Sequence, residues 1–324
     1  MLVHIRLNVP TPLTEQVRGL LVDHAHVTNV VFLEGASLDP EGDLFECDVA
    51  RETASQLLRT LGTIGVGEQG GIVLTTPTGT PFAAARRLER LAPGDPQDAV
   101  VWDNVVSDAY AASRPTVTYH VFLVLATILA AVAVITDSSV LVVGAMVVGP
   151  EFGTVAALCT GLVFARWGLA WASFRLLVLG FAFAIAVVTV LALALVLTGV
   201  ITAEMVTRPR PQTGFIWHPD IWSFVVALVA GAAGVLALTT DRAQAMVGVF
   251  ISVTTVPAAG NMALGIATWQ ASEIIGSVTQ LGVNLLGMLL AGSVVLALQR
   301  AFWLRLMART ESLFGLRRQE PHRR

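Results

Sequence analysis

The sequence predicts an integral membrane protein in which a small soluble α+β domain precedes an α-helical domain of six transmembrane segments. Two observations lead to this fold class. Of the 324 residues, 55% are hydrophobic and 13% are charged, whereas a soluble domain carries about a quarter charged residues. Charged residues are frequent before Arg114 and sparse from there to Arg300. A largely soluble protein is therefore excluded. The four expected regions are a soluble domain at 1–78, an amphipathic helical linker at 79–116, a transmembrane domain at 117–300 and a basic tail at 301–324.

The soluble domain is expected to have the βαββαβ order of a ferredoxin-like fold. Apolar residues alternate in Leu2–Val9, as in a half-buried strand, and Thr14 is a candidate cap for the helix that follows. In chain order, the predicted elements are a strand at 2–9, a helix at 14–24, strands at 27–33 and 44–49 around a turn at 39–43, a helix at 52–61 and a strand at 71–75. This fold hosts metal-binding, ligand-sensing and assembling domains, so it does not name a function.

The linker begins after a run of Thr, Pro and Gly at 76–81, which predicts a hinge. Residues 82–91 and 98–112 are amphipathic and are expected to be helical. These helices are suited to connecting the domains, lying on the membrane surface or packing between subunits.

The membrane domain contains six apolar stretches that are long enough, or nearly so, to cross about 30 Å of hydrocarbon. They lie at 117–136, 139–165, 171–199, 221–240, 243–268 and 274–300. An even number of spans puts both termini on one side, and the arginines of the tail predict that this side is cytoplasmic, in a prokaryotic plasma membrane. Arg208 and Arg210 conflict with this orientation, which places their loop outside. No basic region followed by an apolar run begins the sequence, so no cleavable signal peptide is expected.

The six stretches divide into two similar halves. A helix ending in Thr-Asp is followed by a stretch with Pro-x-x-Gly and then by a third helix, and this unit recurs about 104 residues later. Three spans is an odd number, so the second copy runs opposite to the first. Proline and glycine predict that the second helix of each half is broken near its middle. Inverted repeats with matching broken helices indicate a transporter substrate site; the alternative is two packing kinks, since both residues are common in membrane helices.

The candidate binding residues follow from these breaks. Glu151 is an acid within a membrane segment, suited to proton coupling or cation binding, unless the break lies near the interface and Glu151 reaches headgroups. Matching the two prolines pairs Glu151 with Ala258, and Asn261 with Thr154. Asp137 and Asp241 lie near an entrance or cap the next helix. The full candidate set is Gly149, Pro150, Glu151, Gly153, Thr154, Pro257, Gly260, Asn261, Asp137 and Asp241.

One further pair lies on the last helix. Gln280 and Asn284 are four residues apart, on one face, where they either line a pathway or bond to another helix.

Several other functions are not expected. The sequence contains no Ser-His-Asp constellation, HExxH pattern, phosphate loop or dinucleotide fingerprint, so we expect neither an enzyme nor a bound cofactor. A net charge of −3 implies no nucleic-acid partner. Two cysteines in unrelated contexts provide no disulfide framework or metal site. His4, His24 and His26 lack a matching ligand pattern and are interpreted as surface or core residues.

The run TDSS…GAM…GPEFG at 135–153 resembles a bacterial and archaeal membrane family catalogued as domain of unknown function 389, the uncharacterised hydrophobic domain proteins. The resemblance covers about residues 117–265. It implies a multi-pass membrane protein, often with a soluble N-terminal domain, and supplies no substrate.

The leading hypothesis is a secondary transporter for a small polar solute or ion, with its site between the two broken helices and with protons or sodium as the candidate coupling ions. A channel is one alternative. The other is a non-transporting sensor or scaffold whose N-terminal domain binds a ligand or partner. The lipid bilayer is an expected partner, and exposed sheet edges and the amphipathic linker also predict a homo-oligomer.

Overall fold

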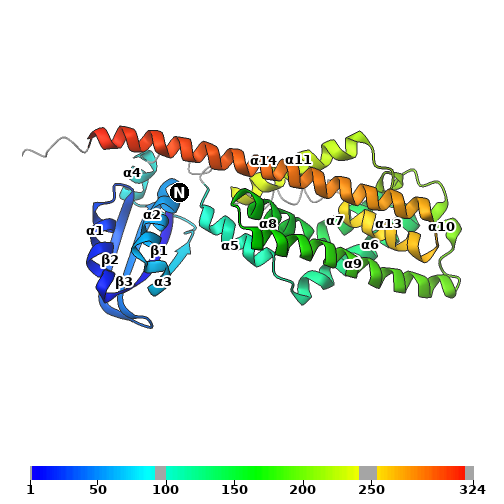
Figure 1. Cartoon of the computed structure of the whole chain (residues 1–324), viewed down its shortest axis with the longest axis horizontal. Coiled ribbons are helices and arrows are strands. Elements are labelled where there is room, and N and C mark those ends of the chain that lie inside the picture. Colours follow the sequence, from blue (N-terminus) through cyan, green and yellow to red (C-terminus); the bar gives the residue numbers. More distant parts are fainter. Residues whose placement is uncertain (1, 92–99, 241–253, 318–324) are drawn as a thin grey trace, which may run out of the picture. The chain divides into compact units, whose positions relative to one another are not determined.

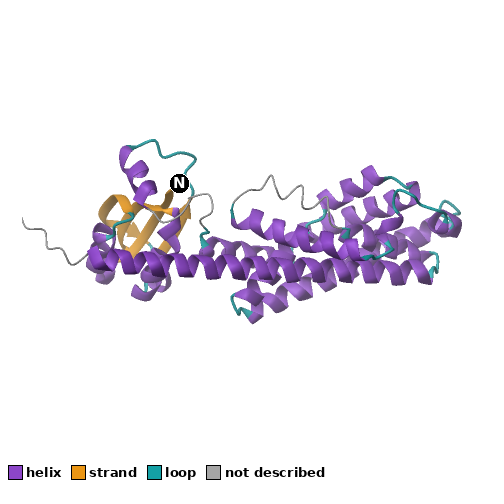
Figure 2. Cartoon of the chain, turned by 90° about the horizontal axis from the view of Figure 1, so that it is seen from above, coloured by secondary structure: helices purple, strands orange, loops and turns teal. Residues whose placement is uncertain are grey.

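The computed structural model describes residues 2–91, 100–240 and 254–317, and the chain divides into two compact units (Figure 1). The first unit comprises residues 1–104 and 304–324, and the second comprises residues 105–303. Among the described residues, strands occur in the first unit, and the second is helical (Figure 2).

The first unit contains a four-stranded antiparallel sheet in the order β2-β3-β1-β4. Its strands are β1 (Leu2–Pro10), β2 (Val27–Leu38), β3 (Glu41–Ala50) and β4 (Gly71–Thr75), and its helices are α1 (Thr14–Asp23), α2 (Arg51–Ile64), α3 (Val66–Gln69) and α4 (Ala83–Leu91), with a 3-10 turn η1 (Thr11–Leu13). This strand order, with α1 and α2 in the two crossovers, is the split βαββαβ arrangement.

The core of this unit follows the alternation in β1. Ile5, Leu7 and Val9 are fully buried and pack with Val17 and other residues of α1 and α2. The β2–β3 hairpin is longer than the sequence predicted, because its ladder continues to a tight turn at residues 39–40. A Cβ on Gly42 would lie 2.2 Å from the carbonyl oxygen of Val9. The lack of a side chain at Gly42 therefore lets β3 run beside β1 to the end of the strand.

The second unit is a helical bundle. Its elements are α5 (Trp102–Ala112, in this unit from Val105), α6 (Val117–Thr136), α7 (Ser139–Val148), α8 (Glu151–Val163), α9 (Trp167–Leu197), α10 (Ala203–Thr207), η2 (Gly214–Ile216), α11 (Ile221–Thr239), α13 (Thr255–Ala267) and α14 (Ala271–Arg317, in this unit up to Trp303). Helices occupy the linker segments 82–91 and 98–112 as expected, except that residues 92–99 lie outside the described part. Most of the expected tail continues α14.

Four of the described helices are long and apolar enough to cross a membrane, namely α6, α9, α11 and the part of α14 up to Phe302. The pair α7 and α8 is bent by 52° and adds a fifth if it is one span. The protein is thus an integral membrane protein with four to five candidate spans among its described residues. The remaining predicted span, 243–268, is described only from Thr254 onward.

The predicted break within the stretch 139–165 is present, as the 52° bend between α7 and α8. Only Gly149 and Pro150 separate α7 from α8, and Gly153 is helical. Pro257 and Gly260 lie within the first two turns of α13, which begins at Thr255. A proline in the first turn of a helix removes an N–H that would have no intrahelical partner, so it starts a helix as readily as it ends one. The residues before α13 lie outside the described part.

Several boundaries in the bundle recur at one interval. The helices α6 and α11 begin at Val117 and Ile221, and α9 and α14 begin at Trp167 and Ala271, each 104 positions apart. Helices α8 and α13 have the same length of 13 residues. Left-handed backbone conformations follow both, at Ala165 (φ 53°) and Trp269 (φ 60°).

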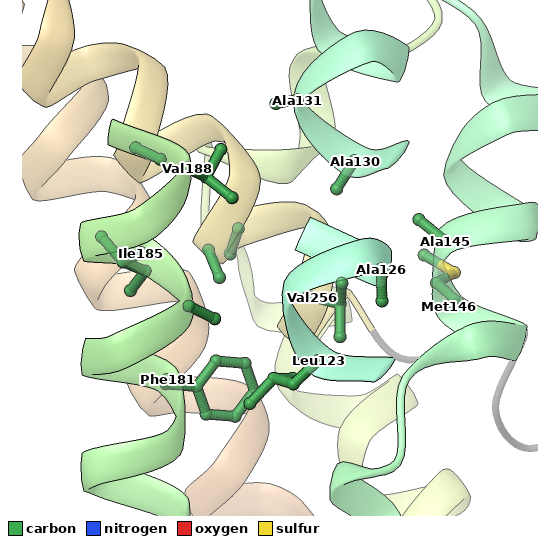
Figure 3. Close-up of a cluster of buried hydrophobic side chains, with 14 of the residues drawn as sticks. Leu123, Ala126, Ala130, Ala131, Ala145, Met146, Phe181, Ile185, Val188 and Val256 are labelled. Carbon is green, nitrogen blue, oxygen red and sulfur yellow. The ribbon is translucent and has the colours of Figure 1, made fainter. Parts of the chain in front are cut away.

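Helix α6 lies at the centre of the bundle and packs against α7, α9 and α13. Leu123 and Ala126 of α6 lie between Phe181 of α9 on one side and Ala145 and Met146 of α7 on the other (Figure 3). Small side chains let these helices approach closely, as is usual in membrane bundles.

Candidate functional site

The carboxyl group of Glu151 is buried at the bend between α7 and α8. The residue is 7% exposed, and its Oε1 accepts a hydrogen bond from Thr255 Oγ1 at 2.6 Å. Its Oε2 is buried without a hydrogen-bond partner among the described residues. The first residues of α8 and α13 are thus joined directly through their side chains.

The residues before Glu151 create the room for its carboxyl group. Pro150 has no N–H to continue the hydrogen-bond ladder of α7 and stands at the cap of α8. A Cβ on Gly149 would lie 2.3 Å from Glu151 Oε2 and 2.8 Å from a methyl group of Val256. Any larger residue at Gly149 would therefore displace the carboxylate.

The start of α13 also connects this site to α14. Thr254 Oγ1 accepts hydrogen bonds from Gln280 Nε2 at 2.9 Å and from Asn284 Nδ2 at 2.8 Å. Gln280 is 2% exposed, and its Oε1 has no partner among the described residues. Gln280 and Asn284 thus bond to the start of a neighbouring helix. Sequence reasoning missed Thr254 and Thr255, although threonines just before a helix-starting proline are typical of a helix N-terminus.

Asn261 lies in a second buried cluster, further along α13 than Thr255. Its Oδ1 accepts from Arg210 Nη1 at 2.7 Å, and its Nδ2 donates to Glu273 Oε2 and to Ser277 Oγ, both at 2.8 Å. Arg210 forms a salt bridge with Glu273 at 2.6 Å, and both side chains are almost fully buried. The polar groups of Asn261 are therefore occupied within this ion-pair cluster.

The two clusters share one face of α14. Its residues Glu273, Ser277, Gln280 and Asn284 are spaced by four, three and four positions, which puts them on one side of a helix. All four are buried. They meet α13 in antiparallel order, since the first two contact Asn261 and the last two contact Thr254. We call these four residues the polar stripe of α14.

Three further candidates pack against other helices instead of the Glu151 carboxyl group. Thr154 Oγ1 donates to the carbonyl oxygen of Ala112 at 3.3 Å, and a Cβ on Gly153 would lie 3.7 Å from the Cβ of Ala112. Both therefore face α5. Gly260 faces α6, because its Cβ would lie 2.7 Å from the Ala130 Cβ.

Asp137 fixes the loop between α10 and α11. Its Oδ1 accepts from Thr213 Oγ1 at 2.8 Å and from the Gln212 N–H at 3.2 Å. The cap of α7 is instead Ser138. Arg208 of the same loop donates to the Ile135 carbonyl oxygen at 2.6 Å. Asp241 lies outside the described residues.

The same loop is packed tightly on the beginning of α14. A Cβ on Gly276 would lie 2.1 Å from the carbonyl oxygen of Trp217. Arg208 and Arg210, which conflicted with the expected orientation, are therefore both bound to protein groups, and Arg210 is neutralised by Glu273.

Residues 146–290 match the family model "Domain of unknown function (DUF389)". This match covers less than half of the chain. The matched range contains Glu151, the start of α13 and the whole polar stripe of α14. The resemblance seen in the sequence is confirmed, although it was placed earlier, at about 117–265.

A relative of the chain is the "Uncharacterized protein MJ0678" of Methanocaldococcus jannaschii, 23% identical over 194 residues. The alignment covers 59% of this chain and 56% of the relative, so the chain spans little more than half of that protein. No solved structure matches the chain.

The residues that match the family model also border an apolar cavity of about 440 Å³ between α8, α9, α13 and α14. Its walls include Leu158, Phe181, Met262 and Leu285, and its described lining residues are all apolar. Neither Glu151 nor the polar stripe lines it, so this cavity offers a polar solute no hydrogen-bond partner.

Proposed function

We propose that the protein is a secondary transporter for a small polar solute or ion, with its site where the first turns of α8 and α13 meet. The observation that carries this proposal is the buried carboxyl group of Glu151. It lies at the bend of a membrane-length helix pair, and one of its oxygens has no partner in the described part of the chain. An acid within a membrane segment is costly, so such residues are rare and mark ion or solute pathways.

The proposal includes two inverted three-helix repeats and six spans. It is supported by the recurrence of helix boundaries at an interval of 104 residues, which places Glu151 and Thr255 at equivalent helix starts. When the two repeats are aligned by their helix starts, the residue equivalent to Glu151 is Thr255. Alignment by the two prolines gives Ala258 instead.

The physical argument rests on the ends of the broken helices. Helix N-termini carry partial positive charge, and interrupted backbone leaves unsatisfied groups that only protein, water or solute can pair inside a membrane. Glu151 is the first residue of α8 and is bonded to the first residue of α13. An ionised carboxylate at this point is stabilised by two helix starts, and neutralising its charge changes their interaction.

The proposed orientation keeps both termini in the cytoplasm of a prokaryotic cell. Arg210 supports it, because Glu273 neutralises its charge within the protein and it does not act as a free loop charge. A homo-oligomer, and the role of the N-terminal unit in assembly or gating, remain predictions.

The test is a solute-uptake and counterflow screen on purified protein in liposomes, with Glu151→Gln measured beside it at several pH values. Saturable flux that follows an ion gradient, and that the substitution abolishes or makes independent of pH, would support the proposal. Ohmic single-channel currents would instead establish a channel. Absence of flux for every solute, together with a tight ligand for the N-terminal unit, would replace the transporter with a sensor.

A further inference from the structure

Two buried oxygen atoms near the start of α13 lack a hydrogen-bond partner among the described residues. They are Oε2 of Glu151 and Oε1 of Gln280. The Glu151 side chain is held by Thr255, and the Gln280 side chain by the preceding residue, Thr254. The amide of Asn284 also donates to Thr254. Buried polar atoms are usually paired, and an unpaired one calls for a missing ion, proton or water.

The C-terminal end of α7 adds further negative partial charge. Pro150 lacks the N–H that would bond the carbonyl group of Met146 four positions earlier. The last carbonyl groups of a helix carry a partial negative charge that favours cations. Because Gly149 has no side chain, the Glu151 carboxyl group lies directly beside this helix end.

The charge of the site selects the class of cation. Glu151 is the only carboxylate among the described residues in this group, and Glu273 is already neutralised by Arg210. A monovalent cation would make the buried site neutral, whereas a divalent one would leave a net charge in a medium of low dielectric. Divalent calcium also recruits six to eight oxygens, commonly from several carboxylates.

We propose that Glu151, Thr255 and Gln280 form a binding site for one dehydrated monovalent metal cation, with oxygen ligands from the carboxylate, the hydroxyl and the amide. This inference deepens the proposed function by naming its coupling ion. The test measures cation binding, so its outcome does not depend on whether the protein transports a solute.

The experiment measures thermal unfolding of the full-length protein in detergent as NaCl replaces choline chloride at constant ionic strength, with KCl as the second cation. Binding of ²²Na⁺ at equilibrium provides the direct readout. The variants are Glu151→Gln, Gln280→Met and a control, Glu204→Gln, which removes an exposed carboxylate from α10.

Sodium or potassium should raise the unfolding temperature of the natural protein and of Glu204→Gln in a saturable way. Glu151→Gln should abolish this response, and Gln280→Met should weaken the cation affinity by about tenfold or more. The same cation response in Glu151→Gln as in the natural protein would overturn the inference. An unfolding temperature that responds to pH but to neither cation would also overturn it and would indicate that Glu151 binds a proton instead.

The result is independent of solute flux. Cation binding without flux would refute the transporter and leave the cation site, whereas flux without cation dependence would refute the cation site and leave the transporter.

Discussion

Thr255 Oγ1 donates a hydrogen bond to Glu151 Oε1 at 2.6 Å, and the two residues are 104 positions apart. Each is the first residue of its helix, α13 and α8 respectively. The contact therefore connects two helix starts that are equivalent in the proposed repeat, and it places the buried acid between the two halves of the domain.

Thr255→Val should destabilise the protein, because it replaces the hydroxyl donor with a methyl group of similar size and leaves Glu151 Oε1 unpaired. Loss of a buried partner costs about 1–3 kcal/mol, measurable as a lower unfolding temperature in detergent. Thr255→Ser retains the hydroxyl and should restore most of the stability. Equal stability of the valine variant would show that this hydrogen bond contributes little.

Gly149→Ala should impair the Glu151 site without unfolding the bundle. Its Cβ would overlap Oε2 of Glu151, so the carboxyl group must move. We expect the cation response and any flux to fall as they do in Glu151→Gln. The matched control is Gly144→Ala, on the same helix pair, where a Cβ meets no atom within 4 Å. Equal effects of the two alanines would contradict the steric argument.

Gly260→Ala should weaken the packing of α13 on α6. The new methyl group would lie 2.7 Å from both the Ala130 Cβ and the Ala131 nitrogen, and overpacking of this kind costs about 1–3 kcal/mol. Gly282→Ala on α14 has open space and should be neutral or slightly stabilising. The unfolding temperatures of the two variants are compared with that of the natural protein. An unchanged unfolding temperature for Gly260→Ala would show that α6 can shift to accommodate the methyl group.

The pair Arg210 and Glu273 should show strong coupling in a double-mutant cycle. Arg210→Met or Glu273→Leu alone leaves a buried charge uncompensated, which costs about 3–5 kcal/mol. The double variant should cost less than the sum of the two. Additive losses would argue against a direct interaction. Arg208→Gln serves as a control from the same loop, because Arg208 is exposed.

Cys47 should react slowly with iodoacetamide in the folded protein. Burial, and secondly the charge of Asp48, raise the pKa of this thiol to about 12, against about 8.5 for a free cysteine. At pH 8 the reactive thiolate is then on the order of a thousandfold scarcer than in the unfolded chain. Peptide mapping by mass spectrometry before and after denaturation measures the ratio.

The sign of this shift also predicts a pH dependence of stability. The folded thiol holds its proton more tightly than the unfolded one, so its contribution is present below about pH 8.5 and is lost as the pH rises toward 12. Similar alkylation of Cys47 in both states would indicate that β3 opens readily.

Local patterns predicted much of the fold. The alternation of Val3, Ile5 and Leu7 identified β1 and its buried face, and Pro150, which acts through the backbone of its immediate neighbours, marked the boundary between α7 and α8. The position of Glu151 at a bend was predictable for the same reason.

The partners of these residues were not predictable. Arg210 and Glu273 are 63 positions apart, and no periodicity relates a loop arginine to a helix glutamate. Matching the two Pro-x-x-Gly motifs pairs Glu151 with Ala258, whereas the helix starts pair it with Thr255, because a proline fits both just before a helix and within its first turn. Predicting the contact of Glu151 with Thr255 would have required knowing that a helix begins at each of these residues.

The polar stripe of α14 has a consequence for how the protein is made. A helix that entered lipid alone would expose a glutamate, a serine, a glutamine and an asparagine to hydrocarbon, at a cost of several kcal/mol. Pairing with Thr254 and Asn261 of α13 removes most of that cost. The two helices are joined by a short turn at 268–270, so membrane insertion favours their release from the translocation machinery together, as a preassembled hairpin.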